Sequence, residues 1–402
     1  MMAFRLSRDA LGIALGLVVL AGCGGGSHPL PTAGGLVQNI RLHQPAASPE
    51  KVLYRFKGGP DGGRPQGGLI EVNGSFYSTT YDGGPGNEGT VFSLEPSGKQ
   101  RVIYSFKKPP DGGQPTAGLV YVNRKFYGTT SFGGYYDAGT VFAVDSAGNE
   151  QVVYSFKGGT TDGSYPSAAL IVVHGTLYGT TESGGASSKG TVFALTTSGS
   201  EHVLYSFKGS RDGTYPMCSL LNVNGTLYGT ASDYFNGEGW GTVFSVTTKG
   251  EERTLYHFKG PPDGATPFSS LLNVKGTFYG TTYAGGTNGW GTVFSINASG
   301  KEHLLYSFKG GADGQQPYAP LIDVKGSLFG TTDGGGGEQS KCDGCGTVFK
   351  VSTSGSENVV YAFQNDPDGA YPMAGLINWK GVLVGTSESG GYDDGTVFQI
   401  TP

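Results

Sequence analysis

The sequence predicts an all-β fold: a seven-bladed β-propeller built from four-stranded antiparallel blades. Three observations lead to this prediction. The tetrapeptide Gly-Thr-Val-Phe recurs seven times at near-constant spacing, each unit contains four short runs rich in β-branched and aromatic residues, and the two ends of the repeat region supply complementary fragments of one unit. Many short strands joined by tight turns also account for the 73 glycines among 402 residues.

The composition excludes several classes of protein. Glycine does not recur at every third position, which excludes a collagen triple helix. A disordered polar chain would not carry 23 Tyr, 22 Phe and 37% hydrophobic residues. The net charge is −5 with acidic and basic residues interspersed, so there is no basic stripe to neutralise nucleic-acid phosphates. We therefore expect no nucleic acid among the partners.

Three short motifs recur once per unit. Gly-Thr-Val-Phe recurs in steps of 49 to 55 residues. A Tyr-x-Phe pair also recurs seven times, and each pair is followed five or six residues later by Asp-Gly-x-x-Pro. The aspartates of this last motif are Asp61, Asp111, Asp162, Asp212, Asp263, Asp313 and Asp368.

The second unit illustrates the predicted strands. Strand A covers 119–122, strand B 126–130, strand C 140–144 and strand D 152–156, because each run is rich in β-branched and aromatic residues and is bounded by turn residues. Glycine marks the turn from A to B in six of seven units, as two-residue hairpins require. A four-stranded meander repeated about every 50 residues is typical of a propeller blade.

The ends of the repeat region predict how the ring closes. The region opens with a strand D at 52–56 that has no preceding A, B or C, and ends with a strand C at 395–400 that has no following D. We expect the N-terminal strand D to complete the last blade, which leaves no open sheet edge. Seven copies of each motif then give seven blades.

The repeats resemble the tandem-repeat family called GloVer, found in bacterial surface proteins with varied anchoring signals. The resemblance rests on the three motifs above together with Leu177-Tyr178-Gly179-Thr180-Thr181 and its counterparts, and covers roughly residues 51–402. It implies an extracytoplasmic, anchored repeat protein and brings no catalytic residues. The architecture is also similar to that of kelch propellers, but this chain lacks a tryptophan in each blade.

The N-terminal residues have the features of a lipoprotein leader. Arg5 and Arg8 precede an apolar stretch at 11–21, and Leu20-Ala21-Gly22-Cys23 resembles the bacterial lipoprotein box. We therefore expect a signal peptide at 1–22, lipidation of Cys23, a flexible tether over 23–50 and the propeller over 51–402. The protein would be exported and anchored through its lipid to the cell-envelope membrane, the outer membrane where there are two. An ordinary signal peptide with a chance cysteine is the alternative.

The seven aspartates recur too regularly to form a single active site. We expect each to accept hydrogen bonds from backbone amides of its own turn, with the following glycine in a left-handed conformation. The alternative is a ring of carboxylates that binds calcium. On the turn interpretation the chain needs no metal and no cofactor.

The face that carries the D-to-A and B-to-C loops is the predicted ligand-binding face, because its loops are long and differ between units. It is rich in aromatic residues, and Trp240 and Trp290 occupy the same place in adjacent units. Such rings stack on sugars or anchor protein partners; alternatively, the tryptophans fill gaps between blades. The candidate ligand-binding residues are Trp240, Trp290, Tyr234, Phe235, Tyr283 and Tyr136, and the D-to-A loops add Tyr165, Tyr215, Phe268, Tyr318 and Tyr371.

The cysteines of the repeat region have separate predicted roles. Cys342 and Cys345 lie in the enlarged B-to-C loop of the sixth unit, where a disulfide is expected after export. A zinc site would need two more ligands, and a redox motif would need a helix start. Cys218 is expected to be a buried free thiol.

The functional prediction is a monomeric, non-catalytic binding module for a glycan or protein ligand. The six histidines share no common loop, and the chain has neither a Gly-x-Ser-x-Gly nor a His-Glu-x-x-His motif. Two alternatives stay open: a polysaccharide-degrading enzyme that uses loop-face carboxylates, and a purely structural or adhesive envelope protein.

Overall fold

The computed structural model describes residues 50–209, 211–233, 239–337 and 344–402. The predicted signal peptide, Cys23 and the tether up to residue 49 lie outside these ranges. In the part of the chain that the structure describes, no helix has the length and hydrophobicity needed to cross a bilayer.

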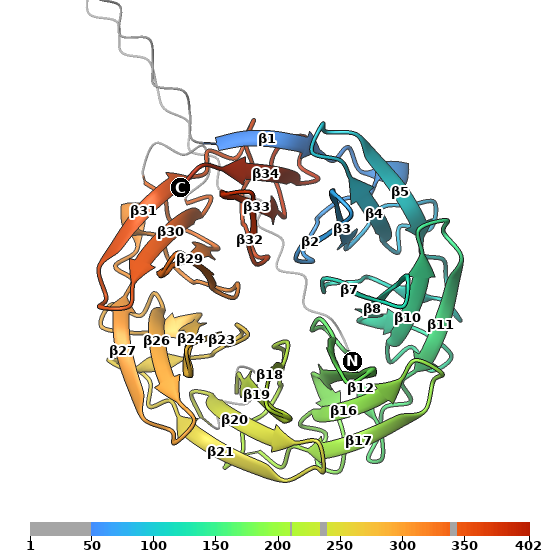
Figure 1. The fold of residues 1–402 in the computed structure, drawn as a ribbon, viewed down its shortest axis with the longest axis horizontal. Helices are drawn as coiled ribbons and strands as arrows, with labels where there is room; N and C mark the ends of the chain where they lie inside the picture. The colour runs from blue at the N-terminus through green and yellow to red at the C-terminus, as the bar shows by residue number, and fades with distance from the viewer. Residues whose placement is uncertain (1–49, 210, 234–238, 338–343) are drawn as a thin grey trace, which may run out of the picture. The chain divides into compact units, whose positions relative to one another are not determined.

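Residues 50–402 form a ring of seven four-stranded antiparallel sheets (Figure 1). The prediction of an all-β, seven-bladed propeller is confirmed. The first three blades, from the inner strand outward, are β2 (Ile70–Val72), β3 (Ser75–Thr80), β4 (Thr90–Leu94) and β5 (Gln100–Ser105); β7 (Val120–Val122), β8 (Lys125–Thr130), β10 (Thr140–Asp145) and β11 (Glu150–Ser155); and β13 (Ile171–Val173), β14 (Thr176–Thr181), β16 (Thr191–Thr196) and β17 (Glu201–Ser206). The next three are β18 (Leu221–Val223), β19 (Thr226–Ala231), β20 (Thr242–Thr247) and β21 (Glu252–His257); β23 (Leu272–Val274), β24 (Thr277–Thr282), β26 (Thr292–Asn297) and β27 (Glu302–Ser307); and β28 (Ile322–Val324), β29 (Ser327–Thr332), β30 (Thr347–Ser352) and β31 (Glu357–Ala362).

The seventh blade joins the two ends of the repeat region. Its strands are β32 (Ile377–Trp379), β33 (Val382–Ser387), β34 (Thr396–Ile400) and β1 (Glu50–Arg55). Strand β1 runs antiparallel to β34, with Glu50 opposite Ile400 and Arg55 opposite Thr396. The chain therefore closes the ring with one N-terminal strand and three C-terminal strands.

Each outer strand contains a bulge. In the second blade Val141 lies opposite Tyr154 and Phe142 opposite Val152, so Val153 is the extra residue. The same shift occurs between the two outer strands of every blade. A bulge strengthens the twist of its strand, and in Figure 1 the outermost strands follow the rim of the ring.

Phenylalanine pairs join neighbouring blades. Phe106, from the Tyr-x-Phe pair that ends the first blade, meets Phe142 of the second blade edge to face at a centroid distance of 4.9 Å, and both rings are fully buried. Equivalent pairs occur at all seven junctions at 4.9 to 5.1 Å. The middle strands are buried on both faces for this reason, as the first five residues of β10 show.

The repeated glycine of strand B packs within its own blade. In the structure a Cβ on Gly128 would lie 2.6 Å from Cζ of Phe142, which is its partner across the same sheet, and 2.9 Å from Leu119. The glycine therefore makes room for the phenylalanine ring that reaches the neighbouring blade.

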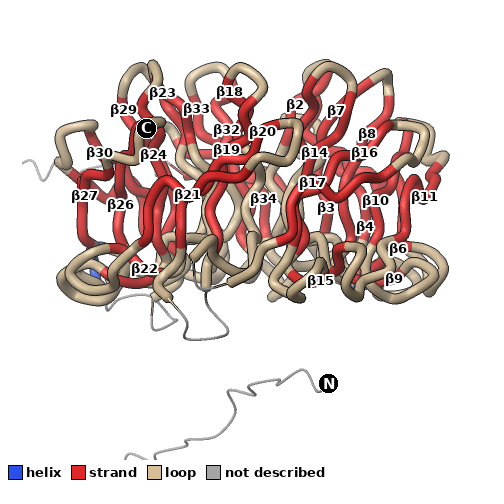
Figure 2. The backbone as a smooth tube through the Cα atoms, turned by 90° about the horizontal axis from the view of Figure 1, so that it is seen from below, coloured by secondary structure: helices blue, strands red, loops and turns tan. Residues whose placement is uncertain are grey.

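The D-to-A and B-to-C loops share one face, here called the loop face. Short two-stranded sheets join these loops in three blades, as β6 (Gly112–Gly113) does with β9 (Phe132–Gly133). The other two are β12 (Gly163–Ser164) with β15 (Ser183–Gly184) and β22 (Gly264–Ala265) with β25 (Ala284–Gly285). Figure 2 shows the loop face below the blades and the hairpin turns above them. The short 3-10 helices η1 (Gly59–Asp61) and η2 (Gly311–Asp313) also lie in D-to-A loops.

Candidate functional site

The repeated aspartates bind groups of their own loops. Asp111 accepts hydrogen bonds from the Tyr104 hydroxyl at 2.7 Å and from the amides of Lys107 and Gly112 at 2.8 Å. In every unit the tyrosine of Tyr-x-Phe donates to the aspartate; the pairs are Tyr54–Asp61, Tyr104–Asp111, Tyr154–Asp162, Tyr205–Asp212, Tyr256–Asp263, Tyr306–Asp313 and Tyr361–Asp368. Within the described ranges no group of three or more His, Cys, Asp or Glu side chains is arranged to hold a metal ion.

The glycine after each motif aspartate was expected to be left-handed, which is wrong for three units: φ is positive at Gly62, Gly213, Gly314 and Gly369, whereas Gly112, Gly163 and Gly264 begin the short strands β6, β12 and β22.

The residue before each motif proline, here called the pre-proline residue, is left-handed in all seven units. The φ values lie between 50° and 58°, although none of these residues is glycine. The left-handed residue makes a bend that two hydrogen bonds hold. The backbone amide of Gln114 donates to the backbone carbonyl of Glu88 in the preceding blade at 2.7 Å. The backbone carbonyl of Gln114 accepts from the backbone amide of Ser131 in its own blade at 3.3 Å.

The same two bonds recur in every unit, at 2.7 to 3.0 Å and 3.0 to 3.4 Å. They place two further sets of residues around the ring axis. The post-proline residues follow each proline and are Gln66, Thr116, Ser167, Met217, Phe268, Tyr318 and Met373. The loop-start residues follow each strand B and are Tyr81, Ser131, Glu182, Ser232, Tyr283, Asp333 and Glu388. A backbone frame that repeats in every blade thus presents side chains that differ.

A cavity occupies the central channel where the seven post-proline segments meet. Its volume is about 290 Å³, and residues from all seven blades line it. All seven post-proline residues line the cavity. The residue two positions after each of them also lines it; these residues are Gly68, Gly118, Ala169, Ser219, Ser270, Pro320 and Gly375. These second residues are small, so they leave the channel open beneath the post-proline side chains.

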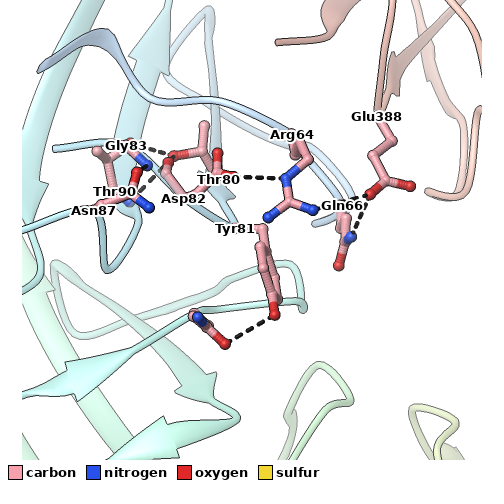
Figure 3. A network of polar contacts seen from close by, with 10 residues as sticks. Arg64, Gln66, Thr80, Tyr81, Asp82, Gly83, Asn87, Thr90 and Glu388 are labelled. Atoms are coloured by element: carbon pink, nitrogen blue, oxygen red, sulfur yellow. Dashed lines mark hydrogen bonds and ion pairs between the residues drawn. The ribbon is translucent and has the colours of Figure 1, made fainter. Parts of the chain in front are cut away.

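One side of the channel mouth is polar and belongs to the seventh, first, second and third blades. The Gln66 amide donates to Glu388 at 2.9 Å, so side chains from two blades meet beside the cavity (Figure 3). Arg64 donates to Asp82 at 2.6 Å and lies 4.0 Å from Glu388. The guanidinium also lies over the Tyr81 ring, 4.6 Å from its centroid. These contacts fix the polar groups of the first blade toward the channel.

The polar side continues into the second and third blades. The Tyr81 hydroxyl donates to Gln114 at 2.8 Å. The Thr116 hydroxyl lies 3.2 Å from that of Ser131 and donates to the Ser167 carbonyl at 3.1 Å. This side of the mouth therefore offers amide and hydroxyl groups held in place by neighbouring blades.

The opposite side of the mouth is aromatic and belongs to the fifth and sixth blades. Phe268 and Tyr318 lie with ring centroids 5.0 Å apart and planes tilted by 35°. Tyr283 meets Phe268 at 5.5 Å and Tyr318 at 6.4 Å, edge to face in both cases. Together the three rings form an aromatic cluster against the cavity, which Phe268 and Tyr318 line.

The negative charges of three carboxyl groups act on Tyr318. Burial raises the pKa of its hydroxyl to about 12, and the negative charges of Glu182, Asp333 and Glu388 contribute to the shift. Glu182 belongs to the third blade, whereas Tyr318 belongs to the sixth, so the interaction crosses the channel mouth. Burial also raises the pKa of Glu182. At neutral pH Tyr318 keeps its proton and can donate a hydrogen bond into an acidic surrounding.

The family model of the Gloeobacter/Verrucomicrobia repeat matches the chain twice, over residues 32–239 and 234–402. The chain belongs to the Gloeobacter/Verrucomicrobia repeat family. This confirms the resemblance derived from the motifs. Among curated protein sequences none matches this repeat protein significantly.

Several solved structures share the fold of this Gloeobacter/Verrucomicrobia repeat protein. Puromycin hydrolase matches with a TM-score of 0.54 and 14% identity over 85% of this chain and 52% of that one. PorZ, a bacterial surface component of the type-IX secretion system of Porphyromonas gingivalis, matches with a TM-score of 0.53 and 13% identity over 86% and 47%. A Bacteroides uniformis protein provisionally assigned as a 6-phosphogluconolactonase gives 0.51 and 15% over 80% and 90%. At these identities the likeness shows the fold alone.

The predicted ligand-binding residues lie at different distances from the channel. Tyr283 belongs to the aromatic cluster at the mouth. Trp240 and Trp290 are 51% and 39% exposed and lie against Gly260 and Gly310, where an added Cβ would come within 2.5 and 2.8 Å of the indoles. Tyr136 is exposed on the B-to-C loop of the second blade. Tyr234 and Phe235 lie outside the described residues.

Sequence reasoning missed the cavity itself. It named Phe268 and Tyr318 as loop-face aromatics but did not group them with the other post-proline residues. The signal was available, because the residue after the motif proline differs between units while the leucine three positions further on does not. Only the ring geometry shows that this variable position faces the axis.

The cysteines are found in two states. Cys345 is disulfide-bonded, and its predicted partner Cys342 lies outside the described residues. Cys218 is a buried free thiol, as predicted. Its sulfur accepts a hydrogen bond from the Thr230 amide at 3.0 Å, and the residue lines the central cavity.

Proposed function

We propose that the propeller is a non-catalytic module that binds a glycan or protein ligand at its loop face, around the mouth of the central channel. One observation carries this proposal: the positions that repeat in every unit are used to build the ring, whereas the positions that vary converge on the cavity. A ligand-binding site needs such a set of dissimilar side chains around a concave surface.

The repeated residues have structural roles, and these explain why they recur in every unit. The motif aspartates bind tyrosine hydroxyls and backbone amides, and the motif phenylalanines fill the junctions between blades. The loop-start residues are under no such requirement, because they form the repeated hydrogen bonds only through their backbone amides, and the post-proline residues take no part in these bonds. Their side chains are therefore free to differ, and the mouth carries amide, hydroxyl, carboxylate and aromatic groups.

A second candidate function is hydrolysis of a polysaccharide. The observation that favours it is Glu182, whose carboxyl has a pKa raised by burial at the edge of the mouth. A carboxyl group that keeps its proton at higher pH suits a general acid. Glu388 or Asp333 would then act as the second carboxylate. Product analysis distinguishes the hydrolase from the binding module.

A glycan array probed with the full-length protein tests the proposal. Bound glycans are recovered and their chain lengths are compared before and after incubation. Binding with unchanged products is the expected result. Shortened products would replace the proposal with the hydrolase, and the absence of binding to any glycan or envelope protein would favour a structural role.

The proposed location is the bacterial cell envelope, with Cys23 as the lipid attachment site. Cys23→Ser is expected to abolish lipid attachment, because the serine hydroxyl does not replace the thiol in forming a thioether. Metabolic labelling with an acyl-chain precursor measures this directly. Label that persists on the Ser variant would show that the attachment lies elsewhere.

A further inference from the structure

We infer that the central cavity binds one terminal sugar ring of a glycan. Its affinity is highest for an amino sugar, lower for a neutral sugar and lowest for an acidic sugar. This inference rests on the proposed binding function and adds the place, the depth and the charge preference of the ligand. Its chemical basis is the division of the mouth into a polar side, an aromatic side and a surrounding set of carboxylates.

The size of the cavity limits the ligand to a small group. Its volume of about 290 Å³ lies at the lower end of the range for small-molecule sites, roughly 300 to 1,000 Å³. It lies on the ring axis, where all seven blades contribute to the walls. A long ligand therefore enters by its end, and the rest of the ligand lies across the loop face.

The two sides of the mouth match the two kinds of surface on a pyranose ring. The faces of Phe268 and Tyr318 suit the C–H face of a sugar. Opposite them, Gln66, Thr116 and Ser167 present one amide and two hydroxyl groups on the polar side. These groups both donate and accept hydrogen bonds, as sugar hydroxyls require.

The charges around the mouth select the sugar. The pre-proline, post-proline and loop-start residues together contain three carboxylates, Glu182, Asp333 and Glu388, and one guanidinium, so their net charge is −3 + 1 = −2. The guanidinium belongs to Arg64, which already pairs with Asp82 at 2.6 Å. Among the described residues, the Glu182 carboxyl group forms no ion pair and no side-chain hydrogen bond. A negative, partly desolvated mouth attracts an ammonium group and repels a carboxylate.

A sugar fits these observations better than a basic peptide side chain does. A lysine side chain would satisfy the carboxylates and the aromatic faces. Its aliphatic stem would offer no partner to the buried Ser167 hydroxyl, which makes no hydrogen bond within the described residues, and this carries a free-energy cost. An amino sugar offers hydroxyl groups to the polar side and an ammonium group to the carboxylates.

Calorimetric titration of the full-length protein with tetramers of glucosamine, glucose and galacturonic acid tests the inference. The titrations are made at about pH 7, because burial raises the pKa of Glu182 and its carboxyl group must be ionised to attract the amine, which still carries most of its proton at that pH. The expected order of affinity is glucosamine, then glucose, then galacturonic acid. Glu182→Gln should reduce the preference for glucosamine over glucose about threefold to fivefold. Glu95→Gln, which makes the same charge change on the opposite face, should leave the preference unchanged.

The aromatic side is tested separately. Phe268→Ala should weaken binding of both the glucosamine and the glucose tetramer up to about tenfold. Tyr121→Ala removes an aromatic ring that is 40% exposed on β7, beside a hairpin turn of the opposite face, and serves as the matched control. Melting temperatures of both variants show whether the ring stays folded. If Phe268→Ala does not fold, Phe268→Leu gives the same test, because it keeps an apolar group and removes the aromatic face.

Three results would overturn the inference: galacturonic acid binding as tightly as glucosamine, unchanged affinity in a folded Phe268 variant, or pentalysine binding as tightly as the glucosamine tetramer. These are distinguishable from failure of the proposed function. If glycans bind on the array and the substitutions in the cavity leave their affinity unchanged, the inference fails and the proposed function stands. If no glycan or protein binds at all, the proposed function fails and the inference fails with it.

Discussion

At the outer rim, six of the seven junctions between blades repeat one cluster of Tyr, Asp and Glu side chains. At the channel mouth, by contrast, the side chains of the seven post-proline residues comprise an amide, two hydroxyls, two thioethers and two aromatic rings. Both regions arise from the same repeat. At the rim every copy faces the same task, which is to join two blades. At the mouth the copies surround one axis and together form one site, so different side chains are useful there.

The rim cluster brings two carboxyl groups together. At the junction of the second and third blades, the Tyr154 hydroxyl donates to Asp162 at 2.9 Å and lies 3.4 Å from Glu201. Burial, followed by the charge of Asp162, raises the pKa of Glu201 to about 7. The corresponding residue in the first blade is Gln100, which donates to the Asp61 carbonyl at 3.3 Å. The repeat thus includes one junction at which an uncharged side chain replaces the second carboxyl group.

The largest expected effect follows from removing the strand that closes the ring. Deletion of residues 51–58 should destabilise the whole propeller, because β34 would lose its outer neighbour and become an open edge. Deletion of residues 24–45 should leave the melting temperature essentially unchanged. Thermal unfolding of the two variants measures both. Equal melting temperatures for the 51–58 deletion and the parent would show that β1 contributes little to closure.

A smaller effect is expected at a single junction. Phe106→Ala should lower the free energy of unfolding by about 3 to 5 kcal/mol, because it empties a fully buried contact with Phe142. Tyr135→Ala, at an exposed position of the loop face, should change it by less than about 0.5 kcal/mol. Chemical denaturation gives both values. Similar losses in the two variants would contradict the division between ring-building and ligand-facing positions.

The rim should also make stability depend on pH. The folded-state pKa values of Glu50, Glu150, Glu201 and Glu357 are raised to about 7 from the ordinary 4.5, chiefly by burial and then by the adjacent motif aspartate. The folded ring binds protons more tightly than the unfolded chain, so the contribution is fully present below pH 4.5 and is lost as pH rises through 7. The melting temperature should therefore be higher at pH 5 than at pH 8.

The natural glutamine supplies the control for this pH dependence. Replacing these four glutamates by glutamine, as at position 100, should flatten the dependence between pH 5 and 8. The post-proline residues do not contribute to it, so Gln66→Ala should leave the slope unchanged. A slope that survives the four substitutions would assign the titration to other groups, of which Glu252 and Glu302 at the remaining two junctions are tested next, because burial also raises their pKa values.

The smallest expected effect concerns the tryptophans of the loop face. Trp240→Ala with Trp290→Ala should leave the fold largely intact, because both indoles are partly exposed, and should weaken ligand capture by about 1 kcal/mol each. Melting temperature and ligand affinity are measured on the same double variant. A large drop in melting temperature would assign both residues to the ring and confine binding to the channel mouth.

The strands, the number of blades and the phase of closure can all be predicted from the amino-acid sequence. These follow from short-range patterns: β-branched runs bounded by glycine turns, seven copies of each motif, and a strand D without a blade at one end. The loop face followed from the alternation of loops in a meander, which places D-to-A and B-to-C loops together. Seven similar copies made each inference robust, because a chance pattern would not recur at the same place.

The tertiary structure alone decided where the site lies. Gln66 and Glu388 are 322 positions apart in the chain, and Glu182 influences Tyr318 from a blade three units away. No local pattern shows that the residue after each proline faces one axis, because that direction is set by the left-handed bend before the proline and by closure of the ring. The same holds for Gly128, whose role depends on the ring of Phe142 across the strand. Burial and the meeting of distant charges, which set the pKa values at rim and mouth, exist only once the seven blades have closed.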